Sequence, residues 1–237
     1  MKQYIQVLLC LLFTSNLFSQ KTYIWCGTLI DGISNEPKKN ITIIVEKNKI
    51  IKVENGFTQP AANDPAQPRT IDLKTKTVTP GWIDMHVHVE QETKKGSLAD
   101  KFTTNPTDIA FESLKYVNAT LMAGFTTVRD LGGSGVNISL RNAINKGLVV
   151  GPRIYTAGKS IATTGGHADP TNGYRKDLMG DPGPKEGVIN GAEEAYQAVR
   201  QRYKEGSDLV KITATGGVLM SIHLAALDCR FVRLRVH

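Results

Sequence analysis

The stretch that decides the fold runs from Thr79 to His88 and reads TPGWIDMHVH. Side chains alternate along a strand, so Asp84, His86 and His88 are expected to share one face. Two imidazoles at the end of an apolar strand are costly to bury alone, and a divalent metal satisfies both. The stretch therefore predicts a metal site. The alternative is a pair of partly exposed histidines that are hydrogen-bonded to backbone.

Further motifs follow this stretch in the chain. They are GFTTVRDLGG at 124–133, GPRI at 151–154, TGGH at 164–167 and VKITATGGV at 210–218. Together with the segment from Pro80 to His88, they resemble the amidohydrolase superfamily, in the imidazolonepropionase-related branch that includes Xaa-Pro dipeptidases. The resemblance runs from about Tyr23 to Leu219.

The resemblance implies an α/β protein built on a (β/α)8 TIM barrel. Such a barrel takes about 250 residues, but only 156 residues run from Trp82 to His237. We therefore expect a partial barrel made of the first four βα units, preceded by a small β-sandwich module. The predicted domains are a signal peptide at 1–19, the N-terminal β module at 20–79, the half barrel at 80–219 and a divergent tail at 220–237.

The resemblance stops at Met220, and a reading-frame slip or premature stop is the simplest expectation for the tail. The alternative is a genuine short variant. The nucleotide sequence after the Leu219 codon, read in three frames, distinguishes these two accounts.

Local sequence patterns predict the elements of both domains. Runs rich in Ile, Val and Thr predict strands at 23–30, 41–46, 49–54 and 70–73. Strands at 126–130, 153–157 and 208–213 alternate with helices at 107–123, 138–146 and 191–205, which favours a parallel sheet. Residues 90–105 are expected to be a loop over the site. Residues 158–190 show no periodicity, which is typical of a functional lid or of disorder.

The bulk properties narrow the location and the partners. Residues 1–19 have a lysine followed by a short apolar run, which is typical of a secretory signal peptide that leaves no stable membrane anchor. We therefore expect an exported protein, periplasmic or secreted. The formal charge is +7, but the basic residues are dispersed and no basic stripe interleaves with aromatics, so nucleic acid is not an expected partner. Cys26 and Cys229 would remain after cleavage, which allows at most a single disulfide.

The resemblance assigns the metal ligands. His86 and His88 would bind one zinc ion, and Lys211 would be carboxylated to bridge two. A lysine near metal cations loses its proton readily, and the carbamate offers hard oxygen ligands. The alternative for Lys211 is a strand-end lysine that points into solvent. Asp84 and Asp130 are expected to orient the ligands rather than to bind the metal.

The substrate-contacting residues are expected on the long segment after the third barrel strand. In the resembled enzymes a histidine in the position of His167 lies beside the substrate and polarises its carbonyl or binds the developing oxyanion. His167 is therefore the predicted catalytic and substrate-binding residue, against the alternative of an ordinary loop histidine. Tyr174 and Arg175 follow it, and a guanidinium pairs well with a substrate carboxylate.

The function implied by the resemblance is metal-dependent hydrolysis of an amide bond in a small molecule, an Xaa-Pro-like dipeptide or an N-acyl amino acid. The resembled enzymes also use two more histidines and an aspartate from later strands, which have no counterpart here. His223 and His237 lie in the divergent tail, outside any matching motif. Two other readings stay open: an inactive fragment with weak metal binding, and a cyclic-amide hydrolase of the imidazolonepropionase type.

Overall fold

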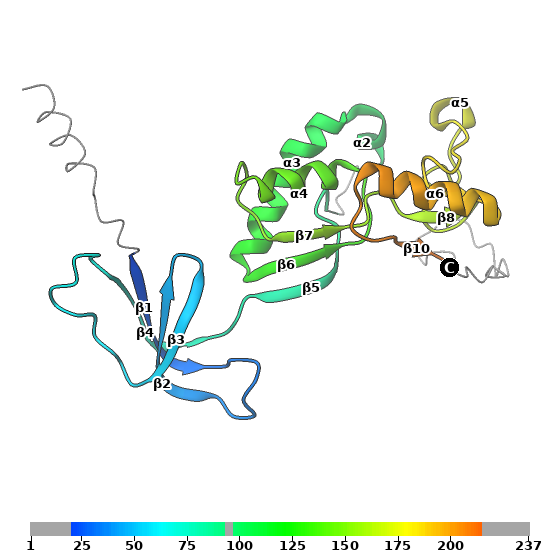
Figure 1. Ribbon diagram of the computed structural model, residues 1–237. Helices are drawn as coiled ribbons and strands as arrows, with labels where there is room; N and C mark the ends of the chain where they lie inside the picture. Colours follow the sequence, from blue (N-terminus) through cyan, green and yellow to red (C-terminus); the bar gives the residue numbers. More distant parts are fainter. Residues whose placement is uncertain (1–19, 93–96, 215–237) are drawn as a thin grey trace, which may run out of the picture. The chain divides into compact units, whose positions relative to one another are not determined.

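The structure is a computed structural model that describes residues 20–92 and 97–214. The chain forms two compact units, Met1–Pro80 and Gly81–His237 (Figure 1). The predicted signal peptide and the predicted tail, with Cys229, His223 and His237, lie outside the described residues. None of the helices within the described ranges combines the length and apolar character needed to cross a bilayer.

The first unit contains one four-stranded sheet. Its strands are β1 (Lys21–Leu29), β2 (Lys38–Glu46), β3 (Lys49–Asn55) and β4 (Arg69–Val78), in the order β3-β2-β1-β4. β1 runs antiparallel to β2 and parallel to β4. Its core is a buried cluster of Cys26, Leu29, Ile41 and Ile43. The predicted strands are confirmed, whereas the second layer of a sandwich stays a prediction because the described residues of this unit form a single sheet.

β4 is longer than the predicted strand at 70–73. The second half of β4 contains Lys74 and Lys76, so the pattern of Ile, Val and Thr residues that predicts a strand does not continue through it. Pairing with β1 extends the strand, since the register resumes at Thr77 after an irregularity between Cys26 and Thr28. Gly27 lies at this irregularity, where a Cβ atom would lie 2.0 Å from the carbonyl oxygen of Lys74. Only glycine allows so close an approach of the two strands.

The second unit begins with a parallel sheet covered by helices. β5 (Trp82–Val87), β6 (Phe125–Asp130) and β7 (Arg153–Thr156) pair in that order, all parallel. α3 (Pro106–Met122) and α4 (Val136–Asn145) lie on one side of this sheet (Figure 1). A buried cluster joins helices to strands and consists of Val89, Val117, Val128, Leu140 and Ile154. The predicted α/β class is confirmed. β5 is an edge strand, and its Trp82, Ile83 and Met85 are 55%, 60% and 53% exposed.

The segment 90–105, predicted as a loop, contains a helix, so that prediction is wrong in part. α2 spans Ser97–Thr103. Seven residues complete only two turns, which is too short for a hydrophobic periodicity to be recognised in the sequence. α3 follows directly, with Asn105 and Asp108 forming a capping box and a proline in its first turn.

The segment 158–190 is also more ordered than predicted. It contains β8 (Ile161–Thr163), α5 (Lys176–Met179) and β9 (Val188–Ile189). β8 pairs in parallel with β9 on one side and with β10 (Ile212–Thr213) on the other. These strands are two or three residues long, and their hydrogen bonds come from distant partners, so no local pattern marks them. The predicted strand at 208–213 is correspondingly shortened to Ile212–Thr213.

A buried arginine fastens this segment to α6 (Ala192–Glu205), the helix that was predicted at 191–205. Arg202 is 0% exposed. Its guanidinium donates hydrogen bonds to the carbonyl oxygens of Lys159 and Lys185, close to the two ends of the segment. The cation is balanced by Glu205, 3.0 Å from its Nε. The side chain of Arg202 thus attaches both ends of the segment 158–190 to α6, the helix that follows it.

Candidate active site

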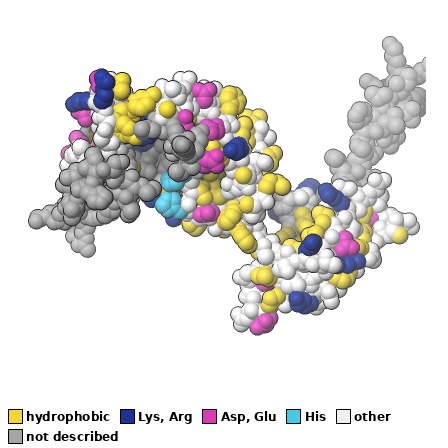
Figure 2. Space-filling model, turned by 180° about the vertical axis from the view of Figure 1, so that it is seen from behind, with side chains coloured by type: hydrophobic (Ala, Val, Ile, Leu, Met, Phe, Trp, Pro, Cys, Tyr) yellow, Lys and Arg dark blue, Asp and Glu magenta, His cyan; other side chains and the backbone are white. Residues whose placement is uncertain are grey.

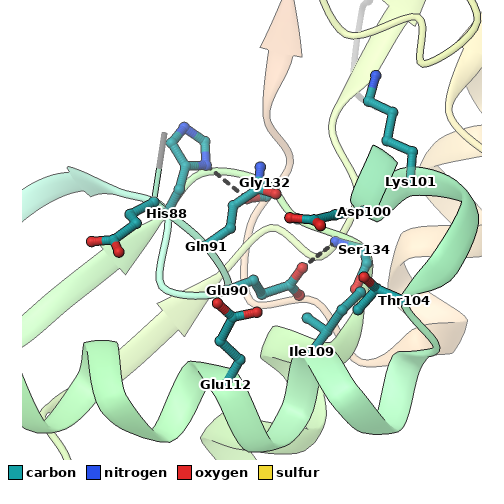
Figure 3. Close-up of a pocket in the computed structure, with 12 residues that line it drawn as sticks. His88, Glu90, Gln91, Asp100, Lys101, Thr104, Ile109, Glu112, Gly132 and Ser134 are labelled. Atoms are coloured by element: carbon teal, nitrogen blue, oxygen red, sulfur yellow. Dashed lines mark hydrogen bonds between the residues drawn. The ribbon is translucent and has the colours of Figure 1, made fainter. Parts of the chain in front are cut away.

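His86 and His88 lie side by side at the carboxyl end of β5. Their ring centroids are 5.4 Å apart and the rings are inclined by 65°. The Nδ1 atom of His88 is 2.7 Å from the carbonyl oxygen of Gly132 (Figure 3). A carbonyl only accepts hydrogen bonds, so Nδ1 donates to it, and in the neutral ring the lone pair is then on Nε2. This is the tautomer in which a histidine can bind a metal.

Asp130, at the end of β6, fixes the backbone on both sides of this contact. Its carboxylate accepts hydrogen bonds from the amides of Val89 and Gly132, each at 3.1 Å, and from the side-chain amide of Asn137 at 3.0 Å. Val89 follows His88 in the chain, and Gly132 supplies the carbonyl that holds its ring. Burial raises the pKa of Asp130, while these three hydrogen bonds oppose the rise. The carboxylate therefore ties the His88 backbone to its hydrogen-bond acceptor.

Lys211 is close enough to His86 for its charge to act on the imidazole. The pKa of His86 is lowered, first by burial and then by the positive charges of Lys211, His88 and Arg129, while Asp84 opposes the shift. Asp84 also accepts a hydrogen bond from the His86 amide at 2.9 Å. A lowered pKa favours the neutral form of His86, which is the form that binds a metal. Lys211 itself is partly buried just before β10, and its carbonyl accepts the Ile161 amide at 2.8 Å.

The donors fit one side of a metal site. The Nδ1 atom of His88 is used by Gly132, which leaves Nε2 for a metal, and its neighbour His86 is biased toward the neutral form. Within the described residues, no three His, Cys, Asp or Glu side chains are grouped so as to hold a metal ion. A third ligand in this part of the chain would therefore have to come from another type of residue, such as Lys211 in a carboxylated form.

His167 lies on an ordered loop after β8, and its side chain is exposed. Asp169 holds this loop by accepting the amides of Gly165 and Thr171, each at 2.9 Å, and the Thr171 hydroxyl at 2.7 Å. Among the described residues, no interaction links the His167 ring to His86 or His88. The catalytic role of His167 therefore stays a prediction.

Tyr174 and Arg175, the predicted carboxylate-binding residues, have different surroundings. The Tyr174 hydroxyl accepts a hydrogen bond from Lys101 of α2 at 3.1 Å. Arg175 is exposed and forms a two-pronged ion pair with Asp177, at 3.1 Å and 2.5 Å. Its guanidinium is thus already paired with a carboxylate in the first turn of α5, the helix that Arg175 precedes.

A pocket of about 420 Å³ opens beside His88. Its lining comes from the end of β5, α2, α3 and the turn after β6 (Figure 3). It consists of His88, Glu90, Gln91, Glu92, Asp100, Lys101, Thr104, Ile109, Glu112, Gly132, Gly133 and Ser134. On the face of the molecule drawn in Figure 2, histidine side chains gather in one patch at the surface of the second unit. The predicted ligand site is therefore next to a cavity large enough for a small substrate.

Glu90 is a structural carboxylate that the sequence did not reveal. It is 6% exposed and accepts the amides of Ser134 at 2.6 Å and Asn137 at 2.7 Å, at the start of α4. Negative charge is favourable at a helix N-terminus. Gly133 makes room for it, since a Cβ atom there would lie 2.6 Å from the Glu90 carboxyl carbon. The adjacent Gly132-Gly133 pair was the available signal, because two glycines at a strand end permit a close approach.

Comparisons with known proteins agree on one family. The family model described as "Amidohydrolase family" matches residues 77–226. A crystal structure of a Xaa-Pro dipeptidase with bound methionine is 48% identical, with a TM-score of 0.78, over 85% of this chain and 48% of that one. A prolidase complexed with N-methylphosphonate-L-proline is 32% identical, with a TM-score of 0.69, over 84% of this chain and 48% of that one.

A curated protein is also similar to this chain. Ochratoxinase from Aspergillus niger is 29% identical over 213 residues, which is 84% of this chain and 43% of the relative. The chain thus spans a little under half the length of the proteins it matches.

Proposed function

Since the chain belongs to the amidohydrolase family, we propose that its second unit carries part of the active site of a metal-dependent hydrolase that cleaves an amide bond in a small substrate. The observation that carries this proposal is the pair His86 and His88, with rings 5.4 Å apart and Nδ1 of His88 committed to a carbonyl. Lys211 lies close enough to this pair for its positive charge to lower the pKa of His86.

We propose zinc as the metal, held by His86, His88 and a carboxylated Lys211, because nitrogen and hard oxygen donors suit it. When bound, such a metal polarises the amide carbonyl and activates the attacking water. Hydrogen-bond directions support the assignment, since the proton of His88 lies on the nitrogen that faces Gly132.

Other residues near the site would orient the two histidines or polarise the substrate. Asp130 holds the amides of Val89 and Gly132, so it keeps the His88 ring at a fixed angle. Asp84 does the same for the amide of His86. We assign to His167 the polarisation of the substrate carbonyl or the binding of its oxyanion, where a preorganised donor is most effective. The Asp169 contacts that order its loop support this role.

We propose an Xaa-Pro-like dipeptide or an N-acyl amino acid as the substrate. The similarity to a Xaa-Pro dipeptidase at 48% identity and to a prolidase bound to a proline phosphonate supports this class. We further propose that the protein is exported, on the basis of the apolar run in residues 1–19. In that location it would act on extracellular or periplasmic substrates.

Metal content and hydrolysis of an Xaa-Pro dipeptide test the proposal, measured on the protein expressed from its verified reading frame. His88→Ala should lose bound zinc and the chelator-sensitive hydrolysis together. His88→Ala with an unchanged zinc content would refute the site. Lys204→Met on the exposed side of α6 is a matched surface control and should change neither quantity.

A further inference from the structure

Two cations near the predicted substrate site differ in what they already bind. The guanidinium of Arg175 makes a bidentate pair with Asp177. The ammonium of Lys101 instead lies 3.1 Å from the Tyr174 hydroxyl oxygen and 4.4 Å from the centre of the same ring. Lys101 is thus held in position by a neutral partner, and this contact does not pair its ammonium with a carboxylate.

The position of Lys101 also favours it over Arg175 as the residue that binds a substrate. Both Lys101 and His88 line the 420 Å³ pocket. Arg175 does not, and Tyr174 is connected to the pocket through its hydrogen bond with Lys101. In Figure 3 the His88 ring and the Lys101 side chain reach toward the same side of the pocket, while Glu90 and Glu112 lie on the opposite side. Among the described residues of the lining, Lys101 is the only lysine or arginine.

The charges of the pocket restrict where an anionic group of a substrate can lie. Glu90 and Glu112 line the side of the pocket opposite Lys101, and their negative charge disfavours a carboxylate there. A substrate carboxylate is therefore stabilised on the side of Lys101.

The hydrogen-bond directions favour joint recognition by Lys101 and Tyr174. An ammonium donates three hydrogen bonds and accepts none, so Lys101 uses one donor on the Tyr174 oxygen and keeps others. The phenol hydrogen of Tyr174 is not used in that contact and remains available to a second acceptor. The pair therefore offers a charged donor and a neutral donor side by side, which matches the two oxygens of a carboxylate.

We propose that Lys101 and Tyr174, rather than Arg175, bind the free carboxylate of the substrate, and that this pair selects amides that carry such a group. The proposal rests on the proposed function for the identity of the reaction, and it assigns the specificity for the acid part of the substrate. Lys101 contributes the charge, and Tyr174 contributes both a donor and the ring that holds the lysine.

Equilibrium binding to the full chain tests this assignment without requiring turnover. N-acetyl-L-proline and N-acetyl-L-prolinamide are titrated into the wild type and into Lys101→Met, Tyr174→Phe, Arg175→Met and Lys204→Met. Loss of a charge-assisted hydrogen bond should weaken binding of the acid about tenfold in Lys101→Met. The amide should bind weakly to the wild type and should be insensitive to this change. Lys101→Arg should restore much of the affinity for the acid, and Lys204→Met serves as the surface control.

Equal binding of acid and amide to the wild type would overturn the proposal. So would a loss confined to Arg175→Met. Circular dichroism of each variant shows whether it is folded, and Lys101→Arg repeats the test at the same position with the charge kept. If the acid binds through Lys101 but no amide is cleaved, the proposed function fails while the carboxylate assignment stands. If amides are cleaved without dependence on Lys101, the carboxylate assignment fails while the proposed function stands.

Discussion

Replacing Asp130 should lower the stability of the protein and disorder the end of β5, where His86 and His88 lie. The carboxylate is fully buried and accepts hydrogen bonds from Val89, Gly132 and Asn137. Asp130→Ala leaves these buried donors without an acceptor, and each unsatisfied group costs about 1–3 kcal/mol. A water molecule that enters the space would recover part of this loss. We therefore expect a destabilisation of roughly 3–5 kcal/mol, out of the ~5–15 kcal/mol that is typical of a domain.

The assay is urea denaturation combined with amide hydrogen exchange. The Val89 and Gly132 amides should be protected in the wild type and should exchange much faster in Asp130→Ala. Asp181→Ala is the matched control, because Asp181 is 74% exposed and pairs only with Lys176 in the described part of the chain. Unchanged protection of the Val89 and Gly132 amides in Asp130→Ala would refute the reasoning.

The variant Asp130→Asn tests the charge of this side chain, because Asn has nearly the same shape as Asp but does not ionise. Burial raises the pKa of Asp130, so the folded state holds the proton more tightly than the unfolded state. Protonated Asp130 therefore stabilises the fold at pH values below the pKa that Asp130 has in the unfolded chain. This stabilisation is lost as the pH rises through the higher pKa that Asp130 has in the folded state. The non-ionising Asp130→Asn variant should therefore lose less stability than the wild type as the pH rises through the acid range. An identical pH dependence of unfolding in the two proteins would contradict this assignment.

Three further predictions concern other parts of the second unit. Lys211→Ala should lower the zinc content, with partial recovery when a small carboxylate such as acetate is added, as measured by elemental analysis; full zinc content would exclude Lys211 as a ligand. Gly132→Ala should destabilise by more than about 2 kcal/mol in denaturant titrations, since φ is +136° and a Cβ atom would lie 2.3 Å from the Ser160 hydroxyl. Arg202→Met should release the segment 158–190 and make it sensitive to limited proteolysis, while equal digestion of variant and wild type would show that other contacts hold it.

The sequence predicted those features that depend on local pattern. Alternation predicted that His86 and His88 lie at the end of one short strand, which holds His86 and ends just before His88, and the helical period of 107–123 located α3 nearly to the residue. The same reasoning missed α2 because seven residues contain too little periodicity. It missed β8 and β9 because they exist only through pairing with each other and with β10.

The site was predicted less completely than the fold. Motif resemblance indicated His86, His88 and Lys211, and the charge of Lys211 does reach His86. The choice between Arg175 and Lys101 was not visible in the sequence. It depends on Asp177 neutralising one cation and on Tyr174, 73 residues away in the chain, holding the other. Glu90 was taken for part of a polar loop because its partners, at the start of α4, are more than 40 residues away.

The contacts that hold His88 and Glu90 span 44 residues in sequence, to Gly132 and to Ser134. They join the end of one strand to the end of the next across the α3 crossover. The geometry of His88 therefore cannot form before β5, α3 and β6 have docked, and entropy of loop closure must be overcome first. The ring of His88 is therefore oriented only once the first βαβ unit has closed, and in the unfolded chain His86 and His88 have no fixed relation to each other.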